Sequence, residues 1–266
     1  MRRHFLLLLL LLPFGMTAQS FEAGLFGGGS YYTGDLNPGL HFTKTKPAYG
    51  ALVRYNLTTR WAFRGGVTMG TLVGIDSLTG DNPARDLNFT SRVTDVSLMI
   101  EFNFFDYFKS VKRNIISPYI FGGIGMFFFN PRSGGIDLVD IGTEGQKVGF
   151  EGREPYKLFS LCMPFGLGFK YNLSRRLSLA VEWGMRKTVT DYIDDVSTTY
   201  YLEGDQIDPS DVDAVMSDPT FSHEPFMERG NPKTKDWYNF TGIYITYRFD
   251  PFLSKRCFDQ QSYRTK

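Results

Sequence analysis

The sequence predicts an all-β protein: an eight-stranded antiparallel transmembrane β-barrel of the outer membrane. Three observations support this fold class. They are an N-terminal export signal, eight segments in which bulky residues alternate with small or polar ones, and connections that alternate between long and short. A period of two places successive side chains on opposite faces of a strand. Bacterial outer-membrane barrels combine such strands with short turns at one end and long loops at the other.

The clearest strand pair lies at residues 161–189, where two alternating runs flank the polar turn 173–176. One face of this hairpin is bulky throughout, whereas the other consists of glycines, small residues and isolated charges. The bulky residues are Leu161, Met163, Phe165, Leu167, Phe169, Tyr171, Leu177, Leu179, Val181, Trp183 and Met185. A soluble sandwich would also alternate, but a bulky face suits lipid and a small or charged face suits a narrow barrel interior.

The N-terminal segment predicts export. Two arginines precede a leucine-rich run at 5–14, and Ala18 offers a small residue at a cleavage point. This is the pattern of a secretory signal peptide, which is too short to cross a bilayer as a helix. We therefore expect a signal peptide at 1–18, a barrel at 19–250 and a periplasmic C-terminal tail at 251–266.

The composition argues against a nucleic-acid partner. The chain carries 29 basic and 28 acidic residues, and this near-neutral balance gives no electrostatic reason to bind a polyanion. No stretch after the signal reaches the roughly 18 apolar residues of a transmembrane helix. A content of 25 Phe and 15 Tyr suits an exported β-protein instead. Cys162 in a strand and Cys257 in the tail are expected to be free thiols.

The eight expected strands follow one another along the chain. They lie at 21–32, 48–56, 61–73, 92–105, 118–129, 156–172, 177–189 and 237–249. The connections at 33–47, 74–91, 130–155 and 190–236 are long, and those at 57–60, 106–117 and 173–176 are shorter. Short turns are periplasmic in bacterial barrels, so both termini are expected in the periplasm and the long loops outside.

Eight strands leave a lumen that side chains can fill. The alternation points eight charged side chains into it: Glu22, Arg54, Arg64, Glu101, Lys170, Glu182, Arg186 and Arg248. One interpretation is a selective channel. The favoured one is a packed ionic core, because buried charges must compensate one another.

The residues offer little support for catalysis or metal binding. Beyond the signal the histidines are His41 and His223, and nothing in the spacing brings His223 to the acidic residues that follow 190. The acidic connection at 190–236 contains oxygen ligands of the kind that calcium prefers, but its run 208–213 lacks the glycine and terminal glutamate of an EF-hand loop. We expect a non-enzymatic protein without a catalytic, cofactor-binding or metal site.

Several runs occur in order along the chain: YTGDL at 32–36, EFNFFD at 101–106, RKTVTDYIDDVS at 186–197 and RGNPKTKDWY at 229–238. Together they resemble the PorG family of the Bacteroidota type IX secretion system, over residues 20–250. The residues that carry the most specific runs are Gly34, Asp35, Asp191, Asp194, Asp195, Arg229, Gly230, Asn231, Asp236, Trp237 and Tyr238.

The resemblance implies a role. PorG-like proteins are outer-membrane barrels associated with a periplasmic ring built by a PorK/GldK-type lipoprotein and PorN/GldN-type proteins. That machine secretes proteins and in some bacteria supports gliding motility. The chain would then be a non-enzymatic component that links the ring to the outer membrane. The alternative is a small outer-membrane barrel of general structural or surface ligand-binding role outside the secretion system.

Two surfaces follow from this topology. The turns and the tail alone would reach a periplasmic ring, and their partner-contact candidates are Lys109, Lys112, Arg113, Lys255, Arg256 and Cys257. On the opposite side, the acidic connection and the run at 229–238 are expected to form a cap over the lumen or to contact another secretion component. In the cap, Arg229 or Lys233 would pair with Asp191, Asp194 or Asp195.

Overall fold

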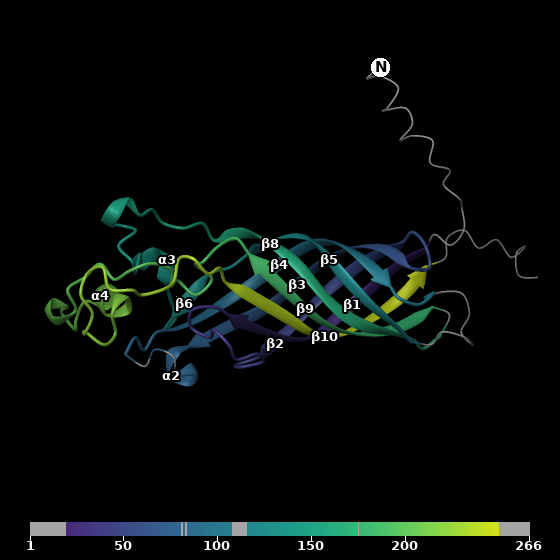
Figure 1. Cartoon of the computed structure of the whole chain (residues 1–266), viewed down its shortest axis with the longest axis horizontal. Helices are drawn as coiled ribbons and strands as arrows, with labels where there is room; N and C mark the ends of the chain where they lie inside the picture. The colour runs from purple at the N-terminus through teal and green to yellow at the C-terminus, as the bar shows by residue number, and fades with distance from the viewer. Residues whose placement is uncertain (1–19, 81, 83, 108–115, 175, 250–266) are drawn as a thin grey trace, which may run out of the picture.

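Eight long strands of the chain pair into one closed antiparallel barrel (Figure 1). The computed structural model describes residues 20–249 except 81, 83, 108–115 and 175. The barrel strands are β1 (Ser20–Thr33), β2 (Lys46–Asn56), β3 (Trp61–Ile75), β4 (Asn88–Asn103), β5 (Ile116–Phe128), β8 (Phe159–Asn172), β9 (Leu177–Thr188) and β10 (Trp237–Phe249). Each strand pairs with its sequence neighbour within this set, so the topology is a simple meander.

The first and last strands close the barrel. β1 and β10 pair along their whole length, from Phe21 opposite Phe249 to Thr33 opposite Trp237. Closure removes the exposed sheet edges that an open sheet would present, which is the condition for a β-structure to cross a bilayer. The eight predicted strands and the fold class are confirmed.

The strand bounds differ from the predicted ones mainly at the start of β4. This strand begins at Asn88 because it continues to pair with β3 as far as Ile75, so the two strands project beyond the rest of the barrel. The prediction missed β6 (Pro131–Ser133) and β7 (Ile136–Asp137). β6 pairs with the projecting part of β4 and then with β7. Both strands are too short to give a periodic signal.

Side chains alternate between the outside and the inside of the barrel as predicted. In β4 the residues Leu98 and Ile100 are exposed, whereas Met99 and Glu101 are buried. The bulky face of the hairpin β8–β9 points outward, and Cys162, Gly168, Lys170, Glu182 and Arg186 face the interior. The outer wall is therefore apolar and the interior polar, which is the arrangement of a transmembrane barrel.

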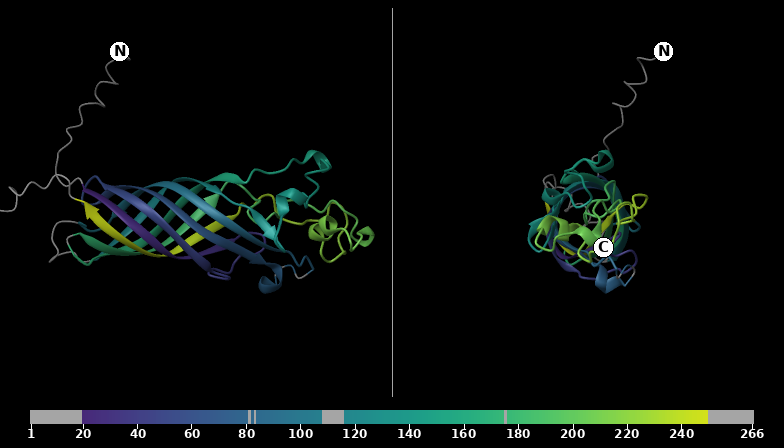
Figure 2. Two further views of the ribbon diagram at one scale, coloured as in Figure 1. Left: turned by 180° about the vertical axis from the view of Figure 1, so that it is seen from behind. Right: turned by 90° about the vertical axis from the view of Figure 1, so that its left-hand side faces the viewer.

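The two ends of the barrel differ. The connections 34–45, 76–87, 129–158 and 189–236 lie together at one end, here called the loop end (Figure 2). The opposite end, here called the turn end, carries the short connections 57–60 and 173–176 together with Ser20 and Phe249.

The helical segments are short and belong to the loop end. They are α2 (Asp76–Thr79), α3 (Leu138–Ile141), the 3₁₀ turns η1 (Phe150–Gly152) and η2 (Gly204–Gln206), and α4 (Val212–Ser217). The carboxylate of Asp211 caps α4 by accepting from the backbone amides of Asp213 and Ala214. Within the described part of the chain, no helix has the length and apolar character needed to span a membrane.

Candidate functional site

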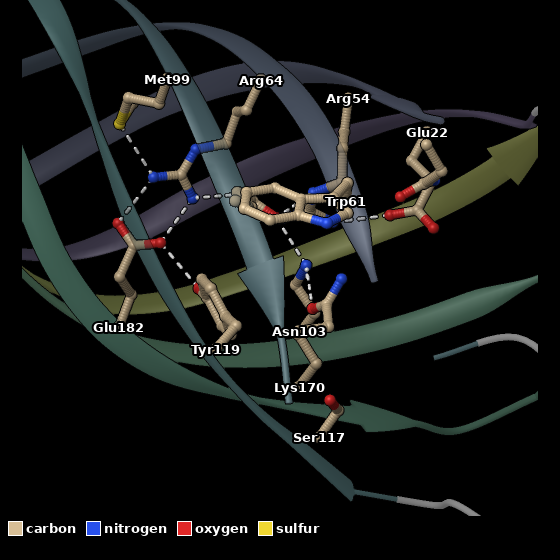
Figure 3. Close-up of polar contacts among 12 residues, drawn as sticks. Glu22, Arg54, Trp61, Arg64, Met99, Asn103, Ser117, Tyr119, Lys170 and Glu182 are labelled. Carbon is tan, nitrogen blue, oxygen red and sulfur yellow. Dashed lines mark hydrogen bonds and ion pairs between the residues drawn. The ribbon is translucent and has the colours of Figure 1, made fainter. Parts of the chain in front are cut away.

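A network of ion pairs lies in the turn-end half of the lumen, and Figure 3 shows its contacts. The guanidinium of Arg54 lies 2.6 Å from Glu22 and 2.8 Å from Glu101. Arg64 in turn lies 3.0 Å from Glu101 and 2.5 Å from Glu182. The Arg54 and Arg64 side chains are 0% and 1% exposed, so both are enclosed by the barrel.

Glu101 is the centre of this network, because a third cation also reaches it. The ammonium of Lys170 donates to Glu101 at 2.5 Å and to Asn103 at 2.9 Å. Tyr119 donates its hydroxyl to Glu182 at 2.7 Å, which satisfies the far end of the chain of pairs. Rings of the interior cover the cations as well: Phe121 lies 4.6 Å from the Arg64 guanidinium.

A second group of polar residues lies above this network, towards the loop end. Arg186 faces Asp95 at 3.7 Å and stacks over Phe240. Tyr238 donates its hydroxyl to the same carboxylate at 2.7 Å, and Cys162 lies beside both. Asp95 is absent from the predicted set of inward charges, although the alternation of β4 places it on the same face as Glu101.

All eight predicted inward charges point into the lumen, and each has a partner. The inward charges therefore form the packed ionic core that the sequence favours. Buried charges of this kind fix the packing because removing one partner leaves the other uncompensated. Side chains of the barrel itself occupy its interior at this level.

A buried carboxylate cluster lies where the loop end meets the barrel. The hydroxyl of Tyr32, near the end of β1, is 2.5 Å from Asp194 and 2.8 Å from Asp236. The remaining oxygens of these carboxylates accept backbone amides: Asp194 from Val196 and Asp236 from Ile193. The cluster thus fixes the course of the long connection 189–236 above the lumen.

These contacts require a proton on the carboxylate pair. A phenol hydroxyl carries one hydrogen, so it can donate to only one of the two carboxylates, and the other must donate to the phenol oxygen. Burial raises the pKa of both Asp194 and Asp236 well above the ordinary value, and each is raised further by neighbouring carboxylates. The pair is therefore best described as sharing a proton.

A buried arginine holds the next layer of the cap. Arg229 donates to the backbone carbonyl of Asp195 at 2.5 Å and lies 3.3 Å from Glu144. Glu144 in turn accepts the backbone amides of Ser197 and Thr198. The Asp195 carboxylate accepts the hydroxyls of Thr143 and Tyr156, and burial raises its pKa to about 6. Connections 129–158 and 189–236 are joined here.

Arg85 joins the remaining connections to this cap. It donates to Asp76 at 2.6 Å, to the backbone carbonyl of Arg229 at 2.6 Å and to that of Asp35 at 2.8 Å. The Asp35 carboxylate accepts the backbone amide of Asn231 at 2.8 Å. The sequence gives no signal for Arg85, because a single arginine in a long loop shows no periodicity.

Most of the residues that carry the family resemblance gather in this cap. Gly34, Asp35, Asp191, Asp194, Asp195, Arg229, Gly230, Asn231 and Asp236 belong to it. Trp237 points to the outer wall beside Phe165, and Tyr238 points into the lumen. The expected cap is thus present, with Arg229 and not the exposed Lys233 pairing with an aspartate. The partner-contact candidates Lys109, Lys112, Arg113, Lys255, Arg256 and Cys257 lie outside the described residues.

The histidine considered for catalysis has a local structural partner. His223 lies 2.9 Å from Asp218 in the same connection and stacks on Tyr200. Among the residues with described positions, no group of three His, Cys, Asp or Glu side chains is arranged to hold a metal ion. Asp191 contacts Ser197 and Lys235 instead of His223.

Comparisons with known proteins give a family and several similar structures. Neisserial surface protein A aligns with a TM-score of 0.46 and 8% identity over 88% of this chain and 100% of that one. The attachment invasion locus protein Ail of Yersinia pestis gives 0.44 and 10% over 88% and 100%, and OprG of Pseudomonas aeruginosa gives 0.38 and 12% over 87% and 97%. A search of curated proteins gives no match. The model of the domain of unknown function DUF6089 matches residues 1–261, and the chain therefore belongs to that family.

Proposed function

We propose that the protein is a non-enzymatic outer-membrane component of the type IX protein secretion machinery, and of the gliding machinery where the two are coupled. It would link a periplasmic ring of PorK/GldK-type lipoprotein and PorN/GldN-type proteins to the outer membrane. The resemblance of the runs at 186–197 and 229–238 to the PorG family supports this proposal. Residues of those runs form the buried contacts of the cap, so the resemblance lies in residues that hold the loops together.

The filled lumen is the observation that carries the proposal. Arg54, Arg64, Glu101 and Lys170 occupy the interior with side chains that are at most 1% exposed. Side chains fill an eight-stranded barrel at that level. Its outer wall and its two ends are then the surfaces that can contact lipid and other proteins. This suits a membrane anchor better than a channel.

The proposal includes an orientation. The turn end, with Ser20 and Phe249, would face the periplasm and the loop end the cell surface, because long loops are extracellular in bacterial barrels. Arg60, which forms an exposed ion pair with Asp106 at 3.3 Å, and the exposed Arg176 lie at the turn end. Together with the basic residues that follow in the sequence at 109–113 and 255–256, they would give the ring a cationic surface to bind.

A mild-detergent pull-down of the tagged protein from its native outer membrane tests the proposal. We expect the ring lipoprotein and its periplasmic partner to co-purify in near-stoichiometric yield. Deletion of 251–266, or the double reversal Arg60→Glu and Arg176→Glu, should reduce that yield several-fold. The matched control is Lys147→Glu, which reverses an exposed charge at the loop end and should leave the yield unchanged.

The result that would overturn the proposal is equally specific. The pull-down would recover the barrel without ring proteins, and a strain lacking the barrel gene would still export the cargo. The alternative role, a general structural or surface ligand-binding barrel, would then stand. The open pocket at the loop end, described below, favours that alternative as the second candidate.

A further inference from the structure

An open pocket of about 360 Å³ lies on the side of the loop end, above the ends of β8 and β9. It forms between the connections 129–158 and 189–236. Its volume lies within the range of about 300–1,000 Å³ that small-molecule sites occupy. The cap residues described above form its back, and the pocket has no part in the lumen network.

A stack of aromatic rings makes one side of the pocket rigid. Tyr156 and Tyr192 stack with ring centroids 4.6 Å apart and planes 11° apart, and Phe129 continues the stack behind Tyr156. The Tyr156 hydroxyl donates to Asp195 of the cap at 2.6 Å. The rings are thus fixed before any ligand arrives. Flat aromatic faces of this kind pack against the apolar C–H face of a sugar ring.

Cationic and anionic side chains surround the rings. Lys157 and Lys235 are exposed at the pocket, and the Lys235 ammonium also donates to the backbone carbonyl of Pro232 at 3.0 Å. Asp191 lies deeper, where it accepts from Ser197 at 2.9 Å and lies 3.8 Å from Lys235. Lysines bind phosphate as point charges, while a paired carboxylate and a hydroxyl suit the hydroxyl groups of a sugar.

The floor of the pocket belongs to the apolar outer wall. Phe159 begins β8 and Val189 follows β9, and they are 48% and 57% exposed. The outer wall below them is the surface that meets lipid. A ligand in the pocket would therefore sit at the membrane surface, with its polar part among the loops and its apolar part along the barrel.

We propose that this pocket binds the phosphorylated saccharide headgroup of a membrane glycolipid. Lys157 and Lys235 would contact the phosphate, and Tyr192 would cover the sugar ring. The Asp191 carboxylate would accept hydrogen bonds from the sugar hydroxyls, and the Ser197 hydroxyl would donate to them or accept from them. The assignment to the outer leaflet rests on the orientation given under the proposed function. The binding chemistry itself is independent of that orientation and of any ring protein.

Titration of the full-length protein in a neutral detergent tests the assignment, with lipid A as the probe and native mass spectrometry as the measurement. We expect lipid A to bind at one site, and the variant Lys157→Gln with Lys235→Gln to bind it at least about tenfold more weakly. The matched control Lys233→Gln neutralises an exposed lysine of the same connection and should bind as the unmodified protein does. Lipid A without phosphates should bind about as weakly as the double variant.

Two further ligands distinguish the source of the phosphate. Glucose 1-phosphate should compete with lipid A if the headgroup alone is recognised, and its failure to compete at millimolar concentration would overturn the sugar-phosphate assignment. Phosphatidylglycerol supplies an anionic phosphate without a sugar, so equal binding would reduce the pocket to general electrostatic attraction and overturn the proposal. Because no ring protein is present, a negative result here leaves the pull-down result unaffected.

Discussion

The Tyr32 hydroxyl lies 2.5 Å from a carboxylate oxygen of Asp194, although the two residues are 162 positions apart in the sequence. Tyr32 belongs to the first strand of the barrel, whereas Asp194 belongs to the longest loop. Their contact therefore attaches the cap to the rigid part of the molecule. Asp236, immediately before β10, shares the same hydroxyl, so the closing pair of strands and the cap meet at one buried point.

Because burial raises the pKa of both carboxyls at this point, the stability of the cap should depend on pH. A carboxyl group whose pKa is higher in the folded state than in the unfolded state stabilises the fold below its unfolded pKa, and that contribution is lost as the pH rises through the folded value. Burial raises the pKa of Asp195 and of Asp191 to about 6, and it raises that of Asp194 and Asp236 well above the ordinary value. The cap should therefore lose stability as the pH rises from about 4 through about 6.

Asp236→Asn tests this dependence. The amide oxygen can still accept from Ile193, while the amide nitrogen donates to the Tyr32 oxygen without needing a titrating proton. We expect the variant to lose less protection of the amides at 193–198 than the unmodified protein as the pH rises, after correction for intrinsic exchange, while the raised carboxyls of Asp191 and Asp195 leave it a residual dependence. Tyr32→Phe is the counterpart that removes the shared hydroxyl and should loosen the cap at every pH. Identical pH profiles for Asp236→Asn and the unmodified protein would contradict the shared proton.

Gly34→Ala should disrupt the same cluster by steric conflict alone. A methyl group at this position would lie 2.0 Å from the Tyr32 hydroxyl and 2.2 Å from Asp236, so the cluster would have to move. We expect a loss of about 1–3 kcal/mol in the free energy of cap opening, measured by hydrogen exchange. Gly39→Ala is a matched control in the same connection, because nothing lies within 4 Å of its added methyl group. Equal effects of the two substitutions would show that chain entropy and not the cluster is responsible.

The barrel was predictable from sequence because lipid and lumen select different side chains at every second position. In β8, Phe169 meets lipid and Lys170 meets Glu101, so the local pattern already contains the tertiary arrangement. Closure and the loop asymmetry followed from counting strands and connections. The start of β4 was missed because its added residues, Asn88 to Ser91, pair with the projecting end of β3 and, at Thr90 and Ser91, with the short strand β6.

The cap was predictable only in outline. The runs at 186–197 and 229–238 could be assigned to one end of the barrel, and Arg229 was correctly expected to pair with an aspartate. The partners Glu144 and Tyr32 come from other loops or strands, so no spacing in the sequence relates them to Arg229 or Asp194. The pocket between Tyr156 and Lys235 depends on the same non-local packing. Its residues come from two separate connections, and the sequence does not show that these connections meet.

Glu101→Gln should destabilise the whole barrel. The substitution keeps the shape of the side chain but removes the charge that Arg54, Arg64 and Lys170 share, and it leaves three buried cations with two carboxylates. Removing one partner of a buried ion pair costs about 3–5 kcal/mol, so we expect a loss of that size in urea unfolding followed by tryptophan fluorescence. Asp137→Asn makes the same chemical change in the exposed pair with Arg132 and should cost less than about 1 kcal/mol. A loss at position 101 no larger than that at 137 would contradict the ionic core.

Arg85→Lys should release the cap without affecting the barrel. Lysine keeps the positive charge but has one nitrogen, so it cannot reach Asp76 and the carbonyl oxygens of Arg229 and Asp35 together. Each carbonyl left without a donor costs about 1–3 kcal/mol where it is buried. We expect faster hydrogen exchange at 34–37 and 229–231, and earlier protease cleavage in 189–236, with unchanged exchange in β8 and β9. Arg132→Lys, in an exposed pair, serves as the control and should leave all of these segments unchanged. Faster exchange spread evenly over the barrel strands would instead mean that Arg85 supports the fold as a whole, and the assignment of Arg85 to the cap alone would be wrong.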